Sequence, residues 1–145
     1  MDLPDGHRPS ATPRPVRAAT AGDVPAIRQL MESVPGFWQP HWSDVTLETA
    51  LRAADGLAFV HEEPMGIVGF ACAHDLGFRA YLSELVVAEG HRGRGIGRGL
   101  LERIGDELGR RGVRPLIADV WLDAVPFYRS LGWVPPEAVL LARRT

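Results

Sequence analysis

The stretch "VVAEGHRGRGIGRGLLERI", residues 86–104, carries the clearest structural signal in the sequence. An apolar, strand-like run ends at the beginning of this stretch, and a helical pattern starts in the later part of the stretch. Between them lie Gly93, Gly95 and Gly97, although glycine weakens a helix. The first N–H groups of a helix have no intrahelical partner and carry the positive end of its dipole. Because glycines let a ligand approach these groups closely, the stretch predicts an anion site between a strand and a helix.

Arginines surround these glycines. From Arg92 to Arg114 there are seven arginines and three acidic residues, a local charge of +4 in a chain whose net charge is −2. Guanidinium groups bind phosphate oxygens well, so the charge and the glycines together indicate a pyrophosphate. A glycine turn followed by a solvated basic helix is the alternative. The dinucleotide fingerprint G-x-G-x-x-G fails, because Arg98 and Leu100 occupy the possible positions of its third glycine.

Composition narrows the classes of protein. All 16 basic residues are arginine, which excludes a phosphate-binding P-loop because its signature requires lysine. The five histidines are scattered, so no metal site is predicted. The single cysteine, Cys72, fits a reducing compartment. No apolar run approaches the roughly 20 residues of a membrane helix, and the first residues lack a signal-peptide core. We therefore expect a cytoplasmic protein.

Hydrophobic periodicity and turn residues predict one α/β domain over residues 15–145, after a disordered tail at 1–14. The expected element order is β-α-α-β-β-β-α-β-α-β, a central mixed sheet with helices on both faces. A strand, a crossover helix and a further strand over residues 79–119 imply a parallel pair at the centre. The expected strands are 16–20, 57–62, 66–77, 79–89, 113–121 and 138–144; the expected helices are 21–34, 43–56, 95–112 and 123–132.

Two motifs resemble the GNAT superfamily of N-acetyltransferases. "RGRGIG" after "LVV" is similar to its acetyl-CoA loop, Arg/Gln-x-x-Gly-x-Gly/Ala, with Arg92, Gly95 and Gly97 at the matching positions. "AVPFYRSLGW", residues 124–133, resembles a second family pattern, A-x-x-F-Y-x-x-x-G-F. One departure is Trp121, which stands where members often carry Asn, so any contact of that Asn with the cofactor is in doubt.

The resemblance implies acetyl-CoA as cosubstrate, lying in a gap between splayed parallel strands. It implies that the amides of Leu85, Val86 and Val87 bind the acetyl carbonyl and the pantetheine arm. It assigns the pyrophosphate to one loop, residues Arg92, Gly93, Arg94, Gly95, Ile96, Gly97 and Arg98. A strand N–H aimed at the thioester oxygen would stabilise developing negative charge there.

The implied reaction is direct attack of an amine on the thioester in a ternary complex, which needs a base for the amine and an acid for the thiolate. Tyr128 matches the family's acid position; a core aromatic is its alternative role. Glu84 is the candidate base, because it is the only carboxylate in "YLSELVV". Strand alternation places it on one face with Leu82 and Val86. Base, acceptor ligand and structural ion pair remain three open roles for Glu84.

The segment "FWQPHW" contains Phe37, Trp38, His41 and Trp42, and lies where the family covers its acceptor cleft. These rings either hold an amine acceptor or anchor the helices to the sheet. We expect an acetyl-CoA-dependent N-acetyltransferase acting on a small-molecule or peptide amine. A non-catalytic acyl-CoA sensor of the same fold is the alternative. No nucleic-acid or membrane partner is expected, and a homodimer is left open.

Overall fold

The computed structural model describes residues 15–145; the tail predicted at 1–14 lies outside this range. Three short 3-10 turns separate some of the regular elements: η3 (Ala21–Asp23), η4 (Glu89–His91) and η5 (Leu122–Ala124). The regular elements are β1 (Val16–Ala18), α1 (Val24–Ser33), α2 (Asp44–Ala54), β2 (Ala58–Glu63), β3 (Gly66–Asp75), β4 (Ala80–Val87), α3 (Ile96–Arg111), β5 (Leu116–Ile117) and α4 (Val125–Ser130).

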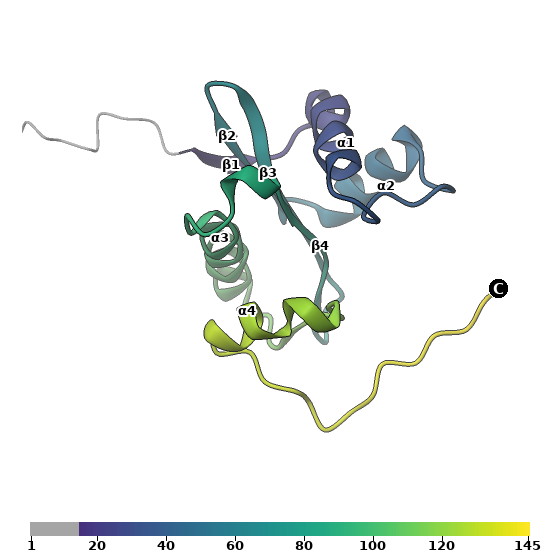
Figure 1. The fold of residues 1–145 in the computed structure, drawn as a ribbon. Coiled ribbons are helices and arrows are strands. Elements are labelled where there is room, and N and C mark those ends of the chain that lie inside the picture. The colour runs from purple at the N-terminus through teal and green to yellow at the C-terminus, as the bar shows by residue number, and fades with distance from the viewer. Residues whose placement is uncertain (1–14) are drawn as a thin grey trace, which may run out of the picture.

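A single mixed sheet organises the described residues. Its strand order is β1-β2-β3-β4-β5; the first four strands are antiparallel, and β4 pairs with β5 in parallel. Helices α1 and α2 pack on one face and α3 on the other (Figure 1). This confirms the predicted mixed sheet with helices on both faces. It also confirms a parallel pair, since a crossover helix joins β4 to β5, but the pair lies at the edge of the sheet and not, as predicted, at its centre.

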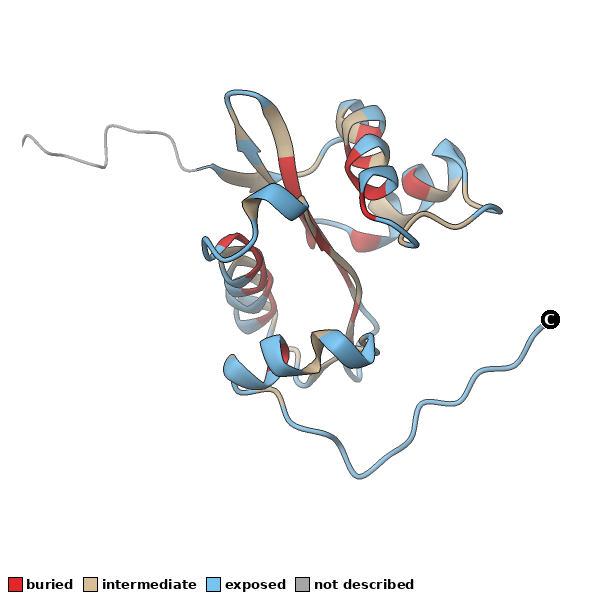
Figure 2. Ribbon diagram, in the orientation of Figure 1, coloured by how far each residue is buried: buried red, intermediate tan, exposed pale blue. Residues whose placement is uncertain are grey.

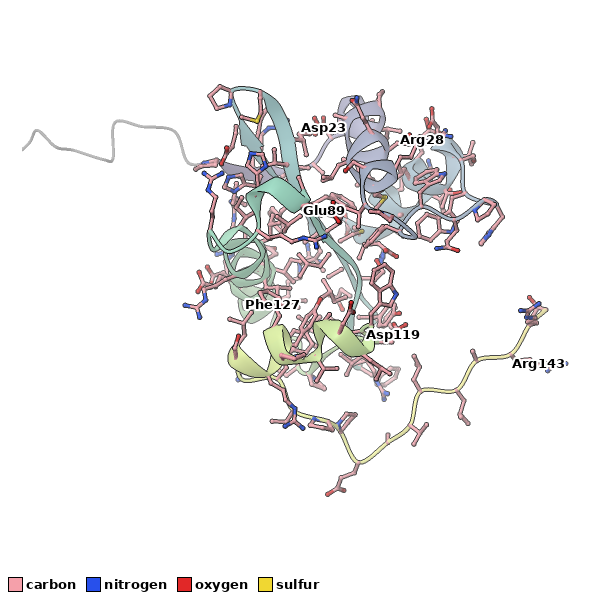
Figure 3. All side chains as sticks on the ribbon, in the orientation of Figure 1. Asp23, Arg28, Glu89, Asp119, Phe127 and Arg143 are labelled. Carbon is pink, nitrogen blue, oxygen red and sulfur yellow. The ribbon has the colours of Figure 1, made fainter. Side chains whose placement is uncertain are left out.

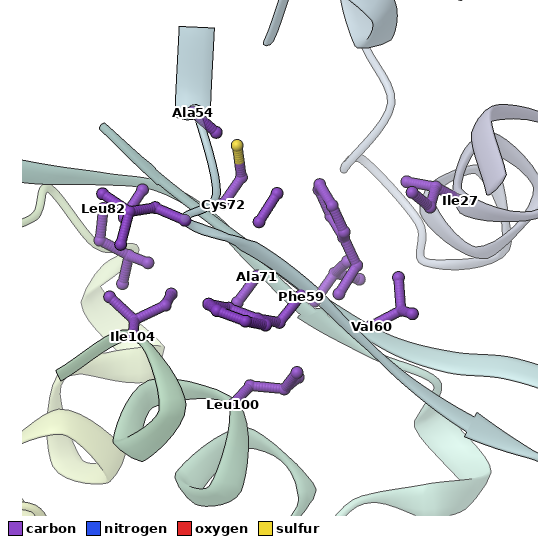
Figure 4. Packing of buried hydrophobic residues seen from close by; sticks show 14 of the residues in the cluster. Ile27, Ala54, Phe59, Val60, Ala71, Cys72, Leu82, Leu100 and Ile104 are labelled. Carbon is purple, nitrogen blue, oxygen red and sulfur yellow. The ribbon is translucent and has the colours of Figure 1, made fainter. Parts of the chain in front are cut away.

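The apolar core lies on both faces of this sheet (Figure 2). On one face Phe59 and Leu82 pack toward Leu100 and Ile104 of α3 (Figure 4). The stripe predicted for this helix is confirmed, because Ile96, Leu100, Leu101, Ile104 and Leu108 are all buried. The opposite face is covered by α1 and α2. The sheet is therefore fixed from both sides, and α3 begins at a fixed point beside it.

A bulge in β4 changes which side chains share a face. Cys72 of β3 pairs with Glu84, whereas Ala73 pairs with Leu82, so Ser83 is the extra residue on β4. An extra residue reverses the alternation of side chains. Glu84 therefore shares its face with Val86 and not, as strict alternation predicted, with Leu82. The Cys72 thiol, on the same face as Glu84, contacts Ala50 of α2, so Glu84 lies on the face covered by α1 and α2.

The C-terminal part of the chain differs most from the prediction. The strand expected at 113–121 is only two residues long in β5. The strand expected at 138–144 is wrong: residues 133–145 contain no helix or strand, and Val139, Leu140 and Leu141 are exposed. A strand forms only where a neighbour offers unpaired backbone groups along an edge, and β5 is too short to provide one. Among residues 15–145, no helix is long and apolar enough to cross a membrane.

Candidate active site

The parallel strands separate after a short contact. Only Ala80 and Tyr81 of β4 pair with β5, at Leu116 and Ile117. From Leu82 to Val87 the β5-facing backbone edge of β4 has no strand partner. A cleft of about 820 Å³ occupies this opening, between the α1–α2 segment, β4, the start of α3 and the η5–α4 segment. Leu85, Val86 and Val87, expected to bind the pantetheine arm, all line it.

One end of the cleft is formed by the start of α3. Gly95 is the N-cap residue, with φ 81°, and no side chain caps the helix. Gly93 has φ 79°, and a Cβ on either glycine would point into open space. Positive φ explains why both positions are glycine. The uncapped amides and the open space in front of them fit a pyrophosphate, so the donors expected for the CoA diphosphate are present here.

Gly97 has a different role. A Cβ there would lie 3.1 Å from Cζ of Phe127, which belongs to α4. This glycine therefore allows α4 to pack against the first turn of α3. Figure 3 shows Phe127 and Asp119 at opposite ends of the region that contains η5 and α4. The two sequence motifs thus meet in space, although about 30 residues separate them along the chain (from Gly97 to Phe127).

The loop's arginines do not all face the cleft. Arg92 and Arg98 line it, and the Arg92 Nε donates a hydrogen bond to the Val87 carbonyl at 3.2 Å. Arg94 does not line it; its guanidinium pairs with Glu63 at 2.9 Å. Glu63, at the end of β2, also lies 3.1 Å from His61 and 3.7 Å from His91. The structure therefore links Arg94 to the β2–β3 hairpin, whereas Gly93, Gly95, Ile96 and Gly97 line the cleft together with Arg92 and Arg98.

Glu84 lines the cleft. Burial, and secondarily the negative charge of Asp119, raise the pKa of its carboxyl to about 7. No arginine or histidine of the described residues forms an ion pair with it, and among its three open roles this disfavours the structural ion pair. A half-buried carboxylate whose pKa lies near neutrality is suited to accept a proton from an amine.

Tyr128 lies across the cleft from the α1–α2 segment. It is 9% exposed and packs edge-on against Phe127 and Trp133, with ring centroids 5.2 Å away in both cases. It nevertheless lines the cleft. Burial, with a smaller effect from the charge of Glu84, raises the pKa of its phenol to about 12. The hydroxyl therefore stays protonated at neutral pH and is able to donate a proton.

The aromatic segment between α1 and α2 divides into two pairs. Phe37 and Trp42 line the cleft, whereas Trp38 and His41 do not. Trp38 packs edge-on against Trp42 and lies under the Arg28 guanidinium, 4.7 Å from its ring centroid. Two rings of the segment, Phe37 and Trp42, therefore border the cleft, whereas Trp38 packs against its neighbours outside it.

Tyr81, Asp119 and Trp121 also line the cleft, although the sequence did not predict them as site residues. The Tyr81 hydroxyl donates a hydrogen bond to the exposed carboxylate of Asp119. Trp121 makes an edge contact with Phe37, with ring centroids 5.8 Å apart. Trp121 was noticed only as a departure from a motif, and nothing in the sequence pairs it with Phe37. Asp119 and Tyr81 lie 38 positions apart and carry no motif.

These features define a class of protein: an α/β domain with a cleft between two splayed parallel strands and an uncapped, glycine-rich helix start at its end. The family model described as "Acetyltransferase (GNAT) family" matches residues 24–133. The chain belongs to this family of acetyltransferases, as its two motifs predicted.

Solved structures agree. The ribosomal-protein-S18-alanine N-acetyltransferase from Escherichia coli is 28% identical, with TM-score 0.68, over 81% of this chain and 75% of that chain. A putative acetyltransferase from Deinococcus radiodurans is 28% identical, with TM-score 0.69, over 88% and 87%. Rv2747 from Mycobacterium tuberculosis, in complex with CoA and NLQ, is 24% identical over 88% and 75% with TM-score 0.71, and shares the fold. Comparison with curated protein sequences gives no match.

Proposed function

We propose that residues 15–145 form an N-acetyltransferase domain that moves the acetyl group of acetyl-CoA to a primary amine. The observation that carries this proposal is the presence, in one cleft, of an uncapped helix start, a carboxyl with pKa about 7 and a phenol with pKa about 12. The first fits the diphosphate, the second the base and the third the acid. The lone, buried thiol of Cys72 fits a reducing compartment, which supports a cytoplasmic location.

Acetyl-CoA supplies the acetyl group as a thioester. Glu84 takes the proton of the bound ammonium, which frees the nitrogen lone pair for attack. An N–C bond forms as the C–S bond breaks. Tyr128 gives its proton to the departing sulfur, and the second proton lost by the nitrogen restores the phenol. Glu84 then releases its proton to solvent, so that acetylated amine, free thiol and one proton are the products.

Residues outside the acid and base hold the reactants. The N–H groups at the start of α3, with Arg92 and Arg98, bind the diphosphate. The backbone of Leu85 to Val87 lies along the open edge of β4, where an extended pantetheine arm would replace the missing strand partner. Phe37 and Trp42 border the space left for the acceptor.

The experiment is a free-thiol assay with acetyl-CoA and a panel of amines and peptides, run beside calorimetric titration with CoA. Thiol release that depends on the amine supports the enzyme. Tight CoA binding without thiol release from any acceptor would favour the alternative, a non-catalytic acyl-CoA sensor. Absence of CoA binding would reject both functions.

A further inference from the structure

Basic residues are confined to one part of the cleft. Its basic side chains, Arg92, Arg98 and His91, all belong to the segment from η4 to the start of α3, which also contributes one carboxylate, Glu89. The other lining residues come from positions 34–42, 81–87 and 118–128, and none of them is basic. They include three carboxylates, Glu84, Asp119 and Asp123. The described acceptor end of the cleft is therefore acidic, and no cation there could bind an acceptor's carboxylate.

Two of these carboxylates, Glu84 and Asp119, differ in how far they are buried and in the groups that surround them. Glu84 is half-buried in the bulge of β4, whereas Asp119 is exposed after β5. They are close enough for the charge of Asp119 to affect Glu84. Asp119 is oriented by the Tyr81 hydroxyl, and a carboxylate accepts further hydrogen bonds through its remaining lone pairs. One carboxylate therefore faces the reacting nitrogen, and a second is held nearer the solvent.

Aromatic rings enclose the space beside these carboxylates. The edge contact between Phe37 and Trp121 connects the α1–α2 segment with the residues that follow β5. Trp42 adds a third ring to the lining. This contact narrows the acceptor end of the cleft, which favours a small acceptor over a protein segment. Ring faces pack against methylene groups and also attract ammonium groups.

We propose that the acceptor is a small diamine: its reacting amine lies at Glu84, its second ammonium pairs with Asp119, and its carbon chain packs against Phe37 and Trp121. This inference rests on the proposed function and narrows its substrate class. A monoamine with an aromatic group would use Glu84 and the rings but leave Asp119 without a role. An amino acid would place its carboxylate among three others and meet no cation. The second positive charge is what accounts for Asp119.

Three compounds with the same four-carbon chain separate these classes: 1,4-diaminobutane, butylamine and 4-aminobutanoate. They differ in the group at the far end, which is an ammonium, a methyl and a carboxylate group, respectively. We expect kcat/KM for diaminobutane to exceed that for butylamine by about fivefold or more, as for a charge-assisted hydrogen bond near the surface. We expect 4-aminobutanoate to be the poorest acceptor. Equal values for the first two amines, or a best value for 4-aminobutanoate, would overturn the proposal.

Asp119→Asn tests the assigned partner. The ratio of kcat/KM between diaminobutane and butylamine should fall to within about twofold of unity, because only the far ammonium loses its partner. This ratio cancels any effect on Glu84, which acts on both amines. Tyr81→Phe should lower the ratio partway. Asp106→Asn, the same change on the exposed side of α3 and outside the cleft, should leave it unchanged. An unchanged ratio in Asp119→Asn would refute the role of Asp119.

Two further measurements complete the test. A peptide amide that begins Ala-Arg carries the same two charges on a larger body; a higher kcat/KM for it than for diaminobutane would contradict a small acceptor.

Calorimetric titration of the three amines into CoA-saturated protein does not depend on turnover. Tighter binding of diaminobutane supports the inference even if the proposed acid–base chemistry fails, and equal binding of all three refutes it even if acetylation is observed.

Discussion

The two ends of the cleft are built in different ways. The end proposed to bind the diphosphate comes from one continuous stretch, residues 87–98, where the start of α3 leaves backbone N–H groups without a side-chain cap. The acceptor end is assembled from three separate segments, and its chemistry depends on side chains such as Glu84, Asp119 and Trp121. A continuous loop keeps its geometry when neighbouring side chains change. A composite surface can be altered residue by residue, so within one fold the acceptor end is where specificity is set.

The largest effect should come from the acid. Tyr128→Phe keeps the ring that packs against Phe127 and Trp133 and removes only the hydroxyl. Loss of a positioned acid costs about 100- to 10,000-fold in the chemical step. Single-turnover rates are the proper measurement, because product release can hide the effect in kcat. CoA affinity should stay within a few-fold, and a single-turnover rate within threefold of wild type would remove the acid role.

The proposed role of Glu84 as base should be visible in the pH dependence of kcat/KM. In the wild type we expect kcat/KM to rise as pH passes about 7, where the Glu84 carboxyl ionises. Glu84→Gln should lower kcat/KM by about 100-fold, the lower limit for a positioned base, and abolish the rise near neutrality. A variant that keeps both the rate and the pH profile would show that Glu84 is not the base.

Glu84→Gln should lower activity but raise the stability of the folded protein. Because the pKa of Glu84 is raised from 4.5 to about 7 in the folded protein, the unfolded chain ionises first as pH rises. The wild type therefore loses stability between about pH 4.5 and 7, by an upper limit of about 3 kcal/mol that partial solvation reduces. Glu84→Gln should melt higher than the wild type at pH 8, and the gain should vanish near pH 4. An equal difference at both pH values would contradict the raised pKa.

A substitution at the proposed diphosphate end should weaken CoA binding. Gly95→Val places a branched side chain in front of the uncapped helix start, so CoA affinity should fall by about tenfold or more, as on loss of one charge-assisted contact or more. Valine also strains a backbone with φ 81°. Gly112→Val is the matched control, because Gly112 ends the same helix with φ 72° but lies outside the cleft. Equal CoA affinity in the two variants would show that the diphosphate binds at another site.

The aromatic segment should show the smallest effect. Trp42→Ala, which removes a cleft-lining ring, should raise the acceptor KM several-fold, as for a cation over an aromatic face worth about 1 kcal/mol. Trp38→Ala removes a ring outside the cleft and should lower the melting temperature without a selective effect on the acceptor. If both variants changed the acceptor KM equally, the division of the segment into two pairs would be wrong.

The glycine turn before α3 and most of the fold could be predicted from the sequence alone. Gly93, Gly95 and Gly97 stand where a strand passes to a helix, and such local geometry is encoded in neighbouring residues. The stripe on α3 and the crossover that makes β4 and β5 parallel also follow from periodicity and chain order. The same local signals failed at 138–144, where an apolar pattern predicted a strand but β5 offers no edge long enough to pair with it.

The proposed acceptor end could not be predicted from the sequence alone. The bulge at Ser83 sets the face of Glu84, and a one-residue insertion into a ladder leaves no mark in the alternation of a single strand. Residues far apart in the chain also come into contact: Arg94 forms an ion pair with Glu63, and the ring of Phe37 makes an edge contact with that of Trp121. Contacts of this kind depend on how whole elements pack, because each side chain's neighbours are supplied by other parts of the sequence.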